Sequence, residues 1–192
     1  MKTVGILGIQ GDVDAHARAL ARVGASPRRV LRAAEIDACD ALVLPGGEST
    51  TIAKGMDRLG LREPIRALAR SGRPILGTCA GAILVAREAR ASERHEPVET
   101  LGLLDAVALR NAYGTQVDSF ARAPDPGCVA RLAGVRCVFI RAPQLVELGP
   151  AVEVLAEVSE RPVLVRQANV WAATFHPELT PDPAVHAAFL GH

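Results

Sequence analysis

The chain has 192 residues, of which 49% are hydrophobic and 22% are charged, which fits one α/β domain and excludes a disordered, collagen-like or coiled-coil protein. The 22 Lys and Arg against 21 Asp and Glu give a formal net charge of +1, so bulk charge indicates neither nucleic acid nor an acidic membrane as a partner. No apolar run reaches the roughly 20 residues of a membrane span, and the N-terminal apolar stretch is too short for a signal peptide.

The four cysteines lack the spacing of a metal site or a disulfide framework. Cys39, Cys79, Cys128 and Cys137 form no C-x-x-C pair, and no histidine lies at zinc-like spacing from any of them. We therefore expect a cytoplasmic protein with reduced thiols, no metal and no other cofactor.

The first half of the chain alternates strand-like and helix-like segments. Continuous apolar runs are typical of strands buried on both faces of a parallel sheet, and apolar positions at helical spacing indicate helices. Strands are expected at residues 4–9, 27–31, 41–44 and 74–77, and helices at residues 15–23, 61–71 and 82–87. This alternation predicts a mostly parallel sheet with helices on both faces.

The second half carries closely spaced strand-like segments, which favour antiparallel pairing. They lie at residues 103–109, 116–120, 135–140, 152–158, 163–167 and 169–175, and a last helix is expected at 183–190. The predicted fold is a three-layer α/β sandwich, in which a mostly parallel central sheet has an antiparallel extension. No linker or repeat divides the sequence, so residues 1–192 are expected to form a single domain.

Cys79 has the sequence setting of a nucleophile. It lies between Gly77 and Gly81 at a predicted strand–helix turn, which is the thiol version of a nucleophile elbow. The glycines leave room for the helix to approach the strand, the helix N-terminus favours a thiolate, and the amide of Ala80 points to where an oxyanion would form. A buried core thiol is the alternative for any lone cysteine, and it remains our interpretation of Cys39, Cys128 and Cys137.

His176 is the histidine best placed to act as a base. It follows the last predicted strand, at the sheet edge where α/β proteins place their sites. Pro177 favours extended geometry at His176, so the carboxylate of Glu178 can lie on the same side and orient the imidazole. The remaining histidines are interpreted as solvated (His95, His192), as structural (His186), or as a residue of the first helix near the end of the first strand (His16).

A glycine pair ends the third predicted strand. Gly46 and Gly47 follow Pro45 and precede Glu48 and Ser49. Two adjacent glycines let backbone amides approach a ligand closely, as a tetrahedral oxyanion requires. A plain turn is the alternative, but the neighbouring elbow strand favours an oxyanion site.

These segments together resemble class I glutamine amidotransferases, whose catalytic groups form a triad. More narrowly, the sequences GGEST, RNAYG, QVDSF, FIRAP and HPELT are similar to those of the glutaminase subunits of pyridoxal 5'-phosphate synthase. The resemblance covers nearly the whole chain. It implies L-glutamine as substrate and Cys79 as nucleophile, with His176 as general acid and base and Glu178 as its orienting acid.

The resemblance also implies the binding residues and the partner. The oxyanion groups would come from Gly46, Gly47, Ala80 and Gln10, and glutamine would contact Gly47, Glu48, Ser49, Arg110, Ile140 and Arg141. Ammonia would pass to a synthase subunit in a hetero-oligomer, with His16 and Asn111 near the shared face. In that family the segment around Gln10 adjusts at the partner interface, so we expect low activity from the isolated chain.

Three alternatives remain at this stage. The chain could be the glutaminase subunit of another amidotransferase, or a non-catalytic regulator on the same scaffold. It could also be a cysteine hydrolase that acts on another amide, thioester or peptide. The complete Cys79, His176 and Glu178 set argues against a regulator, and Glu48 with two nearby arginines favours a free amino acid as substrate.

Overall fold

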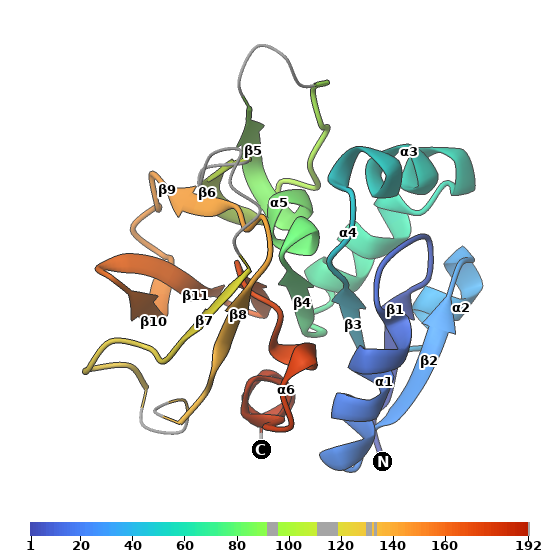
Figure 1. Cartoon of the computed structure of the whole chain (residues 1–192). Coiled ribbons are helices and arrows are strands. Elements are labelled where there is room, and N and C mark those ends of the chain that lie inside the picture. Colours follow the sequence, from blue (N-terminus) through green and yellow to red (C-terminus); the bar gives the residue numbers. More distant parts are fainter. Residues whose placement is uncertain (92–95, 111–118, 130–131, 133, 192) are drawn as a thin grey trace.

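The computed structural model describes residues 1–91, 96–110, 119–129, 132 and 134–191 (Figure 1). Its central sheet has seven strands in the order β10-β11-β12-β4-β3-β1-β2. Five of them are parallel, namely β1 (Thr3–Leu7), β2 (Ser26–Val30), β3 (Ala41–Leu44), β4 (Ile75–Thr78) and β12 (Val170–Ala173). The antiparallel strands β11 (Arg161–Gln167) and β10 (Glu153–Val158) extend one edge. The predicted mostly parallel sheet with an antiparallel extension is confirmed.

Helices cover both faces of this sheet (Figure 1). They are α1 (Val13–Arg22), α2 (Ala33–Asp37), α3 (Ser49–Leu59), α4 (Arg62–Arg70), α5 (Ala80–Val85) and α6 (Ala184–Leu190), and a 3-10 turn, η2, spans Pro177–Leu179. Successive strand residues point to opposite faces, so Leu42 joins a core cluster with Ile65 of α4, while Val43 joins a second cluster with Leu20 of α1 and Phe189 of α6.

Two smaller sheets lie beside the central one. Strands β5 (Ala86–Arg90) and β6 (Leu104–Leu109) pair in parallel, and β9 (Gln144–Val146) pairs antiparallel with β6. Strands β7 (Phe120–Arg122) and β8 (Cys137–Phe139) form an antiparallel pair. In the described part of the chain, no helix combines the length and the apolar character that a bilayer span would need.

The structure differs from the sequence-based expectations at several elements, since helix α2 and strands β5 and β9 were not expected. The helix expected at residues 82–87 begins at Ala80 and ends at Val85, because Ala86 is extended and starts strand β5. Helix α3 was not expected, since its Thr and Gly residues are poor helix formers. The Glu48 carboxylate caps α3 by accepting hydrogen bonds from the amides of Thr50 and Thr51, which stabilises its first turn. Residues 116–118 of the strand expected at 116–120 lie outside the described residues.

Candidate active site

Cys79 lies in a sharp turn between β4 and α5. Its φ of 48° and ψ of −104° are unusual for a residue with a side chain, and they indicate local backbone strain. A Cβ atom added to Gly77 would lie 2.4 Å from the carbonyl oxygen of Gly81, and one added to Gly81 would lie 1.9 Å from the carbonyl oxygen of Leu44. The expectation that both elbow positions leave no room for a side chain is confirmed.

Three neighbouring strands deliver the candidate groups to one edge of the sheet. Strands β12, β4 and β3 are adjacent, with Ala173 in register with Thr78 and Leu44 in register with Gly77. Their carboxyl ends therefore lead directly to His176, Cys79 and Gly46. The amide of Cys79 donates to the carbonyl of Ala173 (2.8 Å), which ties the elbow to the strand before His176.

His176 lies between Cys79 and Glu178. Its Nδ1 donates a hydrogen bond of 2.7 Å to Oε1 of Glu178, whose side chain is only 1% exposed. Burial disfavours the imidazolium, but hydrogen bonds with Cys79 and Glu178 outweigh burial and raise the pKa of His176 to about 10. His176 is thus a cation near neutral pH, held between the sulfur of Cys79 and the carboxylate of Glu178.

Burial opposes ionisation of Glu178, yet its pKa is lowered. The adjacent imidazoles of His16 and His176 favour the carboxylate and outweigh the cost of burial. The acid is therefore ionised near neutral pH, which allows it to stabilise the His176 imidazolium.

Gly46 and Gly47 border the Cys79–His176 pair. A Cβ on Gly46 would lie 2.5 Å from Cε1 of His176 and 3.3 Å from Cβ of Cys79. Gly47 has a φ of 148°, which side chains rarely allow. Gln10 approaches the same segment, since its Oε1 accepts a 2.8 Å hydrogen bond from the amide of Glu48. The residues expected to form the oxyanion site thus lie together beside the candidate nucleophile.

A cavity of about 370 Å³ opens over Cys79. This volume is in the range of small-molecule sites. The structure places every residue expected to contact glutamine in its lining, which consists of Gly47, Glu48, Ser49, Cys79, Ala80, Ile83, Arg110, Ile140, Arg141 and His176. The cavity thus carries both charge signs beside an apolar wall, as a free amino acid would need.

Two charged groups of the cavity, Glu48 and Arg110, already have protein partners. Burial opposes ionisation of Glu48, but the amides of Thr51 and Thr50 outweigh it and lower its pKa. The guanidinium of Arg110 donates to the carbonyl of Glu96 (2.6 Å) and to Oγ1 of Thr50 (3.3 Å), and lies 3.8 Å from the Glu48 carboxylate. Glu48 and Arg110 are therefore held in place before any ligand is bound.

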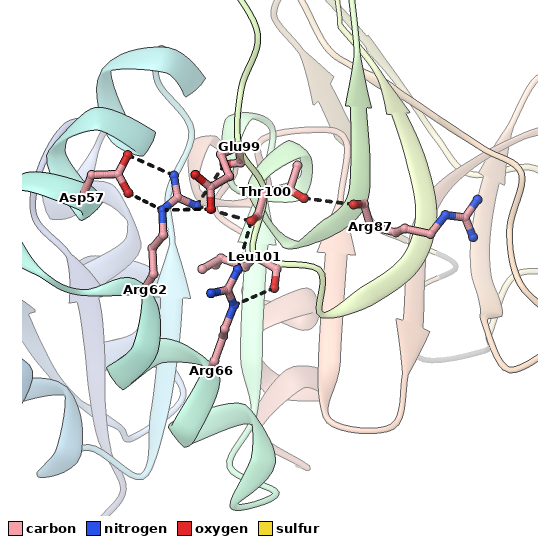
Figure 2. Close-up of polar contacts among 7 residues, drawn as sticks. All are labelled: Asp57, Arg62, Arg66, Arg87, Glu99, Thr100 and Leu101. Carbon is pink, nitrogen blue, oxygen red and sulfur yellow. Dashed lines mark hydrogen bonds and ion pairs between the residues drawn. The ribbon is translucent and has the colours of Figure 1, made fainter.

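Helix α4 binds residues 99–101 (Figure 2), which follow shortly after Glu96 in the chain. Arg62 donates to the carbonyls of Glu99 (3.0 Å) and Thr100 (3.3 Å), and Arg66 donates to those of Leu101 (3.1 Å) and Thr100 (3.4 Å). These bonds fix the segment whose Glu96 carbonyl accepts from Arg110. Sequence patterns contain no signal for this support, because the contacts join distant parts of the chain.

Three buried polar residues lie behind Glu178. His16 was expected near the face shared with the partner, but it is 0% exposed, and the sequence predicted no contact of Glu178 with His16, Thr78 or His186. His16, Thr78 and His186 are fully buried and form a hydrogen-bonded group next to the acid. The sequence feature that could have indicated this group is His16, a polar residue at one of the buried positions of α1. Asn111, expected near the partner-facing surface, lies outside the described residues. Among the residues that are described, no cluster of His, Cys, Asp or Glu is arranged to hold a metal ion.

Comparison with known proteins identifies the family from almost the full length of the sequence. The model of the SNO glutamine amidotransferase family matches residues 6–192. The chain belongs to this family. A relative from Frankia alni, named "Pyridoxal 5'-phosphate synthase subunit PdxT", is 50% identical over 187 residues, which cover 97% of this chain and 92% of the relative. A protein of the same name from Desulforudis audaxviator is 46% identical, covering 99% of this chain and 98% of the relative.

A solved structure described as a glutamine amidotransferase has the same fold as this SNO family member. It superposes with a TM-score of 0.88 at 43% sequence identity, covering 98% of this chain and 97% of the other. The fold expected from the sequence is therefore also the fold of a solved relative.

Proposed function

We propose that this chain hydrolyses L-glutamine to L-glutamate and ammonia as the glutaminase subunit of pyridoxal 5'-phosphate synthase. The observation that carries the proposal is the convergence of Cys79, His176 and Glu178 at the cavity that holds Arg110 and Glu48. Family membership and identities of 46–50% to proteins named PdxT support the same conclusion. No other part of the described chain combines these groups.

The chemistry begins with attack of the Cys79 thiolate on the side-chain amide carbon of glutamine. Amides of Gly47 and Ala80 would stabilise the oxyanion of the tetrahedral intermediate. His176, present as the imidazolium, then gives its proton to the departing nitrogen, so ammonia leaves and a γ-glutamyl thioester remains.

Water completes the reaction through the same histidine. The now neutral His176 takes a proton from water as the oxygen attacks the thioester carbon, and the C–S bond breaks to release glutamate and the Cys79 thiolate. His176 is again the imidazolium and Cys79 again the thiolate, so the cycle closes. Glu178 remains ionised throughout and stabilises each imidazolium state.

The remaining cavity residues would recognise the amino-acid end of glutamine. A guanidinium matches the α-carboxylate, for which Arg110 is better fixed than the exposed Arg141. The Glu48 carboxylate and the carbonyl of Ile140 suit the α-ammonium. Ser49, which is buried beside the cavity, can add a hydroxyl contact.

We further propose that a synthase subunit receives the ammonia and completes the oxyanion site. The Gln10 side chain holds the Glu48 amide, so a partner that moves Gln10 would also move the adjoining Gly46–Gly47 segment. The isolated chain would then hydrolyse glutamine slowly and waste little ammonia. Reduced thiols at the catalytic position suit the cytoplasm.

The test is ammonia release from glutamine with and without the synthase subunit. The proposal predicts slow release by the chain alone, strong stimulation by the synthase subunit, and no release by a complex carrying Cys79→Ala. Absence of stimulated release would favour a non-catalytic regulator. Release that survives Cys79→Ala would exclude the mechanism, and stimulation by a different amidotransferase partner would assign the chain to another pathway.

A further inference from the structure

Two fully buried histidines lie behind the proposed triad and have no part in the chemistry described above. His16 belongs to α1 and His186 to α6, and both are 0% exposed. Nδ1 of His16 lies 3.0 Å from Nε2 of His186, within hydrogen-bond distance. Buried polar groups are costly unless they are hydrogen-bonded, so this pair requires an explanation.

His16 also reaches the acid of the triad. Its Nε2 lies 3.1 Å from Oγ1 of Thr78 and 3.4 Å from Oε2 of Glu178. Oε1 of Glu178 is used by His176, whereas the buried Oε2 makes no hydrogen bond of standard geometry within the described chain. One carboxylate is therefore flanked by two imidazoles, and His16 faces the oxygen that His176 leaves open.

The hydrogen-bond partners select one arrangement of protons on these rings. With a proton on Nε2, His16 donates toward Thr78 and Glu178 and accepts at Nδ1 from Nε2–H of His186. The opposite arrangement would point a nitrogen lone pair at the Glu178 carboxylate. It would also leave a buried N–H on Nδ1 of His186, which has no partner in the described structure.

Both histidines are neutral near pH 7. Burial lowers the pKa of His16, and burial together with the proximity of His16 lowers the pKa of His186 to about 3. Neutrality matters here, because a second cation at His16 would compete with the His176 imidazolium for the single charge of Glu178. A neutral N–H can hold the carboxylate without neutralising it.

We propose that His16 is a positioning residue that holds Oε2 of Glu178 and so keeps Oε1 on His176, and that His186 fixes the tautomer in which His16 can do this. The inference rests on the proposed function for its catalytic consequence. Without the His16 donor, a buried oxygen of Glu178 loses a nearby N–H, which favours protonation of the carboxylate. A protonated Glu178 no longer stabilises the imidazolium, and the Cys79 thiolate loses its counter-ion.

Two polar substitutions separate positioning from simple packing. In H16Q the side-chain amide can reach the place of Nε2 and donate to Glu178. In H16N the amide reaches only the place of Nδ1, where it can still accept from His186. Both variants keep a buried polar group, and a thermal melt of each full-length chain establishes that it is folded.

Two rates are measured for each variant. The first is glutamine hydrolysis by the complex with the synthase subunit, where we expect H16N to lower kcat about tenfold at unchanged KM, and H16Q to retain most of the rate. The second is alkylation of Cys79 by iodoacetamide at pH 7, located by peptide mass spectrometry. This measurement needs no glutamine. We expect Cys79 in H16Q to be alkylated at close to the wild-type rate, and Cys79 in H16N to be alkylated several-fold more slowly. In a Glu178→Gln background, H16N should cause no further loss of kcat.

Equal rates for H16N and H16Q, whether both high or both low, would overturn the proposal, as would an additional tenfold loss in the Glu178→Gln background. If H16N does not fold, a tenfold loss of alkylation rate in folded H16Q overturns the proposal and retention of that rate supports it. A wild-type complex that releases no ammonia would refute the proposed function, while the alkylation rates still decide the role of His16.

Discussion

The proposed catalytic side of the site, with Cys79, His176 and Glu178, and the proposed glutamine side, with Glu48 and Arg110, are built in different ways. Cys79 is 7% exposed and the side chain of Glu178 is 1% exposed, and their positions follow from adjacent strands and close glycine contacts. The side chain of Glu48, in contrast, is 50% exposed. It is placed by hydrogen bonds from Thr50 and Thr51 rather than by packing.

This difference indicates where regulation can act. Groups fixed by close packing cannot shift without displacing the sheet edge, whereas side-chain hydrogen bonds can be exchanged for bonds to a ligand or a partner. The contacts of Gln10 with the Glu48 amide and of Arg110 with the Glu96 carbonyl are of this exchangeable kind. We therefore expect partner and substrate to change the glutamine side and to leave the triad in place.

The largest effect should come from removing the nucleophile. Cys79→Ala should lower glutamine hydrolysis by the complex roughly 10³-fold or more, because every covalent step passes through this sulfur. The melting temperature should change little, since alanine keeps the volume near Cβ. Cys128→Ala is the matched control and should keep its rate. Substantial activity in Cys79→Ala would show that another group attacks the substrate.

A methyl group at Gly46 should disturb the proposed catalytic residues through steric overlap, without removing any of their functional groups. Gly46→Ala places a Cβ 2.5 Å from Cε1 of His176, so the imidazole or the Gly46 backbone must shift and the Cys79–His176 geometry is disturbed. We expect a loss of kcat of about 10²-fold, as for other small displacements of catalytic groups. Gly134→Ala is the control, because nothing lies within 4 Å of its added Cβ. Equal activity of the two variants would contradict the close packing described here.

The glutamine side should respond in KM rather than in kcat. Arg110→Ala removes the guanidinium proposed to bind the α-carboxylate, and we expect KM for glutamine to rise about tenfold or more. Arg58→Ala, at an exposed position of α3, is a control of the same type. An unchanged KM in Arg110→Ala would indicate that Arg141, and not Arg110, binds the α-carboxylate of glutamine.

The last effect concerns stability at alkaline pH. The pKa of His176 is about 10 in the folded chain, against roughly 6.5 for an unfolded histidine, so between these values the folded His176 holds a proton that an unfolded histidine lacks. Its contribution is complete below about pH 6.5 and is lost as pH rises through about 10, at up to about 1.4 kcal/mol per pH unit. Urea unfolding at a series of pH values should show that the free energy of unfolding declines less steeply over this window in His176→Asn than in the wild type. Identical slopes would place the pKa of His176 near its ordinary value.

The two sides also differ in how far the sequence predicts them. Strand ends and turn glycines are local features, so the amino-acid pattern alone places Cys79, Gly47 and His176 at one sheet edge. Helix α3 escapes such a prediction because its start depends on the Glu48 cap and not on apolar spacing alone. His16 and His186 are 170 residues apart in sequence, and only the packing of α1 near α6 brings them together. Such contacts leave no periodic pattern.

The central claim is that the thiol of Cys79 attacks glutamine with His176 and Glu178 beside it. Its most direct test is labelling of the complex with 6-diazo-5-oxo-L-norleucine, a reactive glutamine analogue, followed by peptide mass spectrometry. We expect a single adduct on Cys79, prevented by excess glutamine and greatly slowed by His176→Asn. An adduct on Cys39, Cys128 or Cys137 instead, or labelling of Cys79 that glutamine does not prevent, would contradict it.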